Sequence, residues 1–110
     1  MAKQLKRVTA TKPKIDSDYP YRLRMGTPNQ LGEEQKFKSE GPLRAAIVHN
    51  LRSIHQPWLE RYNVAGVKLV GEILEELSNT TITSERKRIS RCIDEHYGVT
   101  VVYEFWKRLT

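Results

Sequence analysis

The 110-residue sequence holds a single cysteine, Cys92, and no apolar run long enough to cross a bilayer. One cysteine excludes an internal disulfide framework and fits a reducing compartment. A membrane-spanning helix needs about 20 apolar residues, so we expect no membrane partner. The first residues have the cations of a signal peptide but no apolar core behind them. We therefore expect a cytoplasmic protein, or a nuclear one in a eukaryote.

Motifs for catalysis and metal binding are also missing. The sequence has no glycine-rich phosphate loop, no GxSxG and no CxxC, HExxH or HxE pattern. Cys92 and His96 are four residues apart and would share one face of a helix, but a closed zinc site needs four ligands. Cys92 lies among apolar residues, so we expect it to be buried as a small hydrophobe. We predict no enzymatic activity, no metal and no cofactor.

Positive charge is the main compositional feature. Nineteen Lys and Arg outnumber thirteen Asp and Glu, which gives a net charge of +6. Residues 1–24 hold seven of these cations against two aspartates, and residues 83–110 hold six against four acidic residues. Such an excess favours partners that carry negative charge: nucleic acid, an acidic protein surface or an anionic membrane. No feature of the sequence defines an oligomeric state.

A chain of this length forms one domain at most. Residues 1–40 are rich in proline and glycine and poor in apolar residues, so they predict a basic, largely extended N-terminal arm. One exception is the stretch 21–25, where alternation would place Tyr21, Leu23 and Met25 on one face of a short strand. Residues 41–110 are predicted to form a compact domain.

Apolar periodicity predicts helices in this compact domain. A first helix begins near Pro42, with Leu43, Ile47 and Leu51 on one face, and ends near residue 56 because Pro57 disfavours helical geometry before it. A second helical pattern covers residues 58–77, with a break expected near residue 63. Residues 83–97 predict a third helix, which places its cations opposite its apolar residues. Gly98 would end that helix in the left-handed conformation.

Residues 99–109 fit two structures. Val99, Val101, Tyr103 and Phe105 alternate as in a strand, whereas the spacing of EFWKRL is that of a helix. We favour the helix, because only one other strand candidate exists to pair with. The predicted fold class is therefore mostly α, a small bundle of three to four short helices preceded by an extended basic arm. The alternative is an α+β fold with a small two- or three-stranded sheet built from residues 21–25 and 99–105.

The order of a basic helix, a glycine turn and a second helix resembles a helix-turn-helix over residues 83–109. In that motif the second helix reads bases in the major groove. Here it would open on Val101, Val102 and Tyr103, which are not side chains that read base edges. We therefore predict contact with the phosphate backbone rather than with bases.

The predicted function is that of a small noncatalytic nucleic-acid-binding protein, for DNA or RNA, which holds the phosphate backbone through its basic arm and a cationic helix face at residues 86–91. The predicted binding residues are Lys3, Lys6, Arg7, Lys12, Lys14, Arg22, Arg24, Arg86, Lys87, Arg88, Arg91, Lys107 and Arg108.

The alternative function is that of an accessory protein that binds and modulates a larger protein machine, which could itself process nucleic acid. Tyrosine and tryptophan are enriched in protein interfaces, and the candidate contact residues are Tyr19, Tyr21, Phe37, Trp58 and Trp106. For both tryptophans, packing in the core is the competing interpretation.

Overall fold

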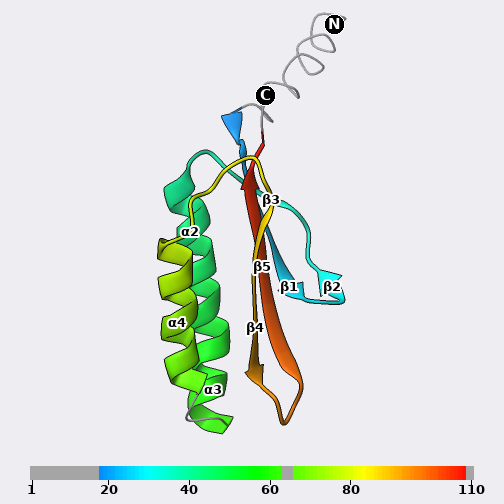
Figure 1. Cartoon of the computed structure of the whole chain (residues 1–110), viewed down its shortest axis with the longest axis vertical. Helices are drawn as coiled ribbons and strands as arrows, with labels where there is room; N and C mark the ends of the chain where they lie inside the picture. The colour runs from blue at the N-terminus through cyan, green and yellow to red at the C-terminus, as the bar shows by residue number, and fades with distance from the viewer. Residues whose placement is uncertain (1–17, 63–65, 109–110) are drawn as a thin grey trace, which may run out of the picture.

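Residues 18–62 and 66–108 are described by the structure, a computed structural model, and they form an α+β fold. Five strands make one antiparallel sheet, and the helices pack on one of its faces (Figure 1). In chain order the elements are β1 (Tyr21–Thr27), β2 (Gln30–Leu31), β3 (Gln35–Phe37), α2 (Glu40–Asn50), η1 (Leu51–His55), α3 (Gln56–Tyr62), α4 (Gly66–Ser78), β4 (Lys87–Asp94) and β5 (Val99–Lys107). The predicted mostly helical bundle is therefore wrong.

β5 is the central strand of the sheet, in which the strand order is β2-β1-β5-β4. It pairs with β1 along one edge, from Lys107 opposite Tyr21 to Val102 opposite Gly26. Along its other edge it pairs with β4. The outer edge of β1 pairs with β2 at one end and with β3 at the other. β2 and β3 thus act together as one interrupted edge strand.

The hydrophobic core lies between the sheet and the helices. Side chains alternate between the two faces of a strand, and Val101, Tyr103 and Phe105 of β5 belong to the buried core cluster. The helices contribute Leu43, Ile47, Leu51, Leu59, Val70, Ile73 and Leu77 to the same cluster. The cluster therefore shows which face of each strand is turned toward the helices.

The helical segment from Glu40 to Tyr62 passes through Pro57, where the sequence predicted an end. A proline ring normally clashes with the carbonyl four residues before it. The preceding turn, η1, is π-helical, and the Gln56 N–H donates to the Leu51 carbonyl five residues back. This wider turn gives the ring room. α4 then runs back along this segment, as Figure 1 shows, so the predicted helical pattern of residues 58–77 is divided between two helices.

Residues 87–94 form β4, where the sequence predicted a helix. Ile89 and Ile93 are four residues apart, a spacing that suits one face of a helix and also one face of a strand. Pairing with β5 decides between the two, because it completes the second edge of the central strand. Gly98 has the predicted left-handed conformation, with φ at 67°. It lies in the turn of the β4–β5 hairpin and not at a helix end.

Residues 21–37 of the predicted arm are part of the sheet. The strand candidate at residues 21–25 falls within β1, and the candidate at residues 99–105 falls within β5. Leu23 is fully buried in the core, as the alternation of this stretch implied. Residues 1–17 lie outside the part of the chain that the structure describes.

Two glycines lead to opposite predictions for stability. A Cβ on Gly26 of β1 would lie 2.3 Å from the Gln30 carbonyl oxygen, whereas a Cβ on Gly71 of α4 would meet nothing within 4 Å outside its own helix backbone. We expect Gly71→Ala to raise the free energy of unfolding by about 0.5–1 kcal/mol, because alanine loses less backbone entropy in a helix. Gly26→Ala should lower it. Urea unfolding followed by circular dichroism measures both, and effects of the same sign would contradict the close approach at Gly26.

Candidate nucleic-acid interface

The face of the sheet turned away from the core, which we call the open face, has no helix over it among the described residues (Figure 1). Residues that lie opposite each other in antiparallel strands share a face. The register places on the open face Lys36 of β3, Arg22 and Arg24 of β1, Val102, Glu104 and Trp106 of β5, and Arg88 of β4. Cations from three strands therefore meet on one surface.

Glu104 lies in the middle of this group, opposite Arg24 on one side and Arg88 on the other. Its carboxylate accepts a hydrogen bond of 3.0 Å from Arg88 Nη2 and forms an ion pair with Arg86, 3.6 Å from Nη1 to Oε1. Glu104 is only 8% exposed. A buried carboxylate thus holds two guanidinium groups over the β4–β5 pair.

Arg86 also stacks on Trp106. Its guanidinium carbon is 4.1 Å from the centroid of the indole ring, which is a cation–π geometry. Trp106 is 6% exposed, so most of the ring is covered. The tryptophan therefore positions a cation rather than offering a bare ring to a ligand.

Arg22 and Arg24 connect β1 to the segment that follows it. The Arg22 Nη1 donates to Glu34 at 2.6 Å, and its Nε donates to the Tyr19 carbonyl at 3.0 Å. The Arg24 Nε donates to the Gly32 carbonyl at 3.0 Å. Arg22 is 1% exposed, so its role is to hold this end of the open face together. Arg24 is half-buried and lies closer to solvent.

The open face has an excess of positive charge, because Lys36, Arg22, Arg24, Arg86 and Arg88 stand against Glu34 and Glu104. The side chains of Arg86 and Arg88 are 58% and 48% exposed. A guanidinium group has five N–H donors, so an arginine bonded to one carboxylate oxygen keeps donors for an additional anion. The arrangement can therefore bind phosphate groups without losing its internal ion pairs.

The predicted cationic helix face at residues 86–91 does not exist, because these residues lie in and next to a strand. Alternation sends Arg88 to the open face and Lys87 to the other. Arg91 bonds to Glu76 of α4. Two more predicted cations lie at the C-terminal end of β5. The Lys107 ammonium is 5.5 Å from the centroid of the Tyr21 ring, and the Arg108 backbone N–H donates to the Pro20 carbonyl. The other predicted cations lie outside the described residues: Lys3, Lys6, Arg7, Lys12 and Lys14.

The aromatic residues of the alternative function are mostly packed. Tyr21, Phe37 and Trp58 are partly buried against the core cluster. Tyr19 is half-buried, with the Lys38 ammonium 5.6 Å from its ring centroid. Neither tryptophan is fully exposed. The five candidate side chains therefore do not form one aromatic docking surface.

Two residues of the open face were missed by the sequence reasoning, Glu104 and Lys36. For Glu104, the sequence pattern that could have revealed its place is the alternation of side chains at residues 21–25 and 99–105. Read as paired strands, these stretches place Glu104 on the face opposite to Tyr103 and Phe105, which is also the face of Arg22 and Arg24. Lys36 has no comparable signal, because β3 contains only three residues.

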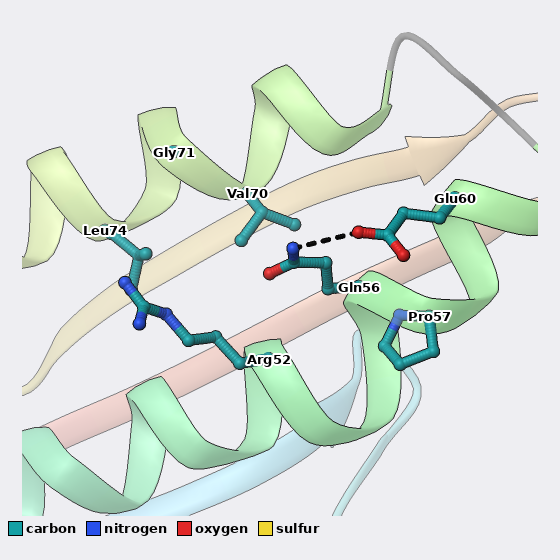
Figure 2. Close-up of a pocket in the computed structure, with 7 residues that line it drawn as sticks. All are labelled: Arg52, Gln56, Pro57, Glu60, Val70, Gly71 and Leu74. Atoms are coloured by element: carbon teal, nitrogen blue, oxygen red, sulfur yellow. Dashed lines mark hydrogen bonds between the residues drawn. The ribbon is translucent and has the colours of Figure 1, made fainter.

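A hollow of about 490 Å³ lies between the helices on the side away from the sheet (Figure 2). Arg52 extends along it toward Leu74, and Gln56 donates a hydrogen bond of 3.1 Å to Glu60. One arginine and one glutamate line it. Its charge is balanced, and it is not part of the open face.

The described residues contain no group of three or more His, Cys, Asp and Glu side chains placed to hold a metal ion. Cys92 is exposed, which contradicts the expectation that it is buried. As part of β4 it lies opposite Thr100, on the face away from the core.

Within residues 18–62 and 66–108, no helix combines the length and the apolar character that crossing a bilayer requires.

Comparisons of the chain with protein-family models, with curated proteins and with solved structures gave no match.

The ion pair of Arg22 leads to a prediction for stability. Glu34→Ala removes the carboxylate that a guanidinium group of 1% exposure binds, and such a bond to a charged group contributes about 1.5–3 kcal/mol. We expect urea unfolding to show a loss of that size. Glu33→Ala, which removes the neighbouring exposed carboxylate, is the control and should change the free energy of unfolding little. Equal losses for the two variants would show that Glu34 does not anchor the open face.

Proposed function

We propose that the protein is a small noncatalytic nucleic-acid-binding protein that contacts the phosphate backbone through the open face. The observation that supports this most strongly is the convergence of Arg24, Arg86 and Arg88 beside Lys36, on a sheet face that no helix of the described residues covers. Residues 1–17 add further cations to the chain, but the proposal does not depend on where they lie.

The spacing of these cations suits a chain of phosphates. Neighbouring strands lie about 4.8 Å apart, so the row from Lys36 on β3 across β1 and β5 to Arg86 beside β4 extends over roughly 14 Å. Several phosphates of one strand of nucleic acid fit along that length, since successive phosphates of a strand advance about 3.4 Å along a duplex. The row can therefore neutralise more than one phosphate.

The open face favours contacts with phosphates over the reading of bases. Its side chains in the described strands are mainly cations and small or apolar residues, and the register places no Asn or Gln among them. Asn and Gln are the residues that pair with adenine, and arginine can pair with guanine. Here Arg86 and Arg88 are already oriented by Glu104, so we propose that binding depends little on sequence.

The test is a titration with labelled duplex DNA, single-stranded DNA and RNA, followed by fluorescence anisotropy at about 50 and 200 mM salt. We expect the affinity of the wild-type protein to fall steeply with salt. The double variant Arg86→Gln, Arg88→Gln should bind more weakly. Its slope of log K against log salt should be reduced by about 1.4–1.8, since each phosphate contact contributes about 0.7–0.9. Glu104→Gln, which removes the negative charge under the two arginines, should bind more tightly.

The matched control is Arg52→Gln with Arg61→Gln, which removes two exposed cations from the helical segment. It changes the net charge by the same amount and should leave affinity and salt slope nearly unchanged. Circular dichroism checks that every variant is folded. Absence of salt-dependent binding by the wild type, or equal losses in the two double variants, would refute the open face as the binding surface.

The second candidate function is that of an accessory protein for a larger protein machine. It is favoured by Tyr97, in the β4–β5 turn, which is 61% exposed. Its ring meets Trp58 of α3 edge to face, with the centroids 5.9 Å apart. Tyrosine and tryptophan are enriched among the residues that contribute most to binding in protein interfaces. Under this function, none of the three nucleic acids binds in a salt-dependent way.

A further inference from the structure

A pocket of about 360 Å³ lies on the helix side of the sheet, away from the cations of the open face. It is bounded by the C-terminal end of β1, the N-terminal end of β5 and the π-helical turn η1. Apolar side chains of Met25, Val99 and Val101 come from the strands. Ile54 comes from η1. The volume is within the range of about 300–1,000 Å³ that is typical of small-molecule sites.

Two polar side chains with unused hydrogen-bonding capacity line this pocket. Asn50 accepts a hydrogen bond of 2.6 Å from the Tyr103 hydroxyl, which leaves its amide nitrogen with two donors. That nitrogen has no partner among the described residues, and neither ring nitrogen of His55 has one. A few polar groups in an otherwise apolar pocket are the usual means of orienting a ligand.

The environment of the pocket disfavours a charged ligand. Burial lowers the pKa of His55 below its usual 6.5, so its imidazole is uncharged at neutral pH. Burial also raises the pKa of Tyr103, so its hydroxyl stays protonated and keeps donating to Asn50. Glu33, a carboxylate of the lining, is exposed to solvent. A charged molecule in the pocket would lose its hydration without gaining a buried counter-ion.

The wall formed by η1 is unusual in two respects. A single π-helical turn is rare and is frequent at functional sites, and here it supplies Ile54 and His55 to the pocket. Ile54 is also 59% exposed, one of the few large apolar side chains of the described chain that face solvent. An exposed apolar residue at a pocket of this kind extends the apolar surface that a ligand can cover.

We propose that this pocket binds a small, uncharged, mostly apolar molecule that carries a hydrogen-bond acceptor, such as a neutral heteroaromatic ring. The ring lies against Met25, Ile54 and Val101, and its acceptor takes a hydrogen bond from the Asn50 amide or pairs with His55. The ligand is either a free metabolite or a base of a nucleic-acid strand, since both offer the same ring chemistry. The site does not depend on the nucleic-acid proposal, because it shares no cation with the open face.

Three probes of nearly equal size test the proposal on the intact chain: quinoline, which carries a ring acceptor, naphthalene, which lacks it, and N-methylquinolinium, which is charged. Binding is followed by the amide resonances of ¹⁵N-labelled protein. We expect quinoline to give saturable shifts around Asn50, Ile54, His55 and Val101. Naphthalene should bind about two- to tenfold more weakly, the fold-change of one lost hydrogen bond. N-methylquinolinium should not bind. Shifts outside the pocket, no saturation with quinoline at millimolar concentration, or equal binding of the cation would each overturn the proposal.

Ile54→Trp places a larger side chain at the pocket and should abolish the quinoline shifts. Ser53→Trp puts the same side chain on the neighbouring exposed position, which does not line the pocket, and should preserve them. If both variants keep the shifts, the proposal is wrong. Addition of adenosine and of a short single-stranded oligonucleotide separates the two sources of the ligand. Competition by adenosine indicates a free molecule, and competition by the oligonucleotide alone indicates a base presented by a strand.

Discussion

The structure depends on the pairing of β5 with β1 and β4. This strand is buried from Val101 to Trp106, and its alternation separates two environments. Val101, Tyr103 and Phe105 meet the helices and complete the core. Val102, Glu104 and Trp106 face the other way, where Glu104 and Trp106 hold Arg86 and Arg88. Since the period of a strand is two, a slip of one residue in this pairing would exchange the two environments and bury Glu104 in the core. The hydrophobic core and the charged surface are therefore specified by the same six residues.

This division explains how one small domain presents two different surfaces. The open face is electropositive and ordered by ion pairs, whereas the pocket beside η1 is largely uncharged and lined by apolar side chains. Both surfaces also include residues of the segment that follows β1. Arg22 and Arg24 bind the segment after β1 to the sheet. The same segment contributes Gly32, Glu33 and Gln35 to the pocket. Stability of the β1–β5 pairing should thus influence both sites.

The sequence predicts part of this fold and little of the site. Apolar periodicity predicts helical structure near residues 42–56 and 58–77, and the structure has it over residues 40–62 and 66–78, because the apolar stripes face one continuous core. The strands were harder to predict, since Ile89 and Ile93, and the residues from Val99 to Trp106, fit helical and strand periods equally well. Long-range pairing with β1 decides between these periods, and local spacing contains no information on it.

The four arginines of the open face were predicted as phosphate ligands. Their convergence was not, because it requires β1 and β4 to flank the same strand. Pro57 was misleading, because the helical segment continues through it after a π-helical turn.

The most direct test of this account is to map where nucleic acid binds. ¹⁵N-labelled protein is titrated at low salt with a short single-stranded oligonucleotide, and the amide resonances and the Trp106 indole N–H are followed. If nucleic acid binds to the open face, shifts are expected at Arg24, Lys36, Arg88 and Trp106, and the outer sides of α3 and α4 should be unchanged. Shifts confined to the helices, or no shifts at a salt concentration that favours phosphate contacts, would contradict it.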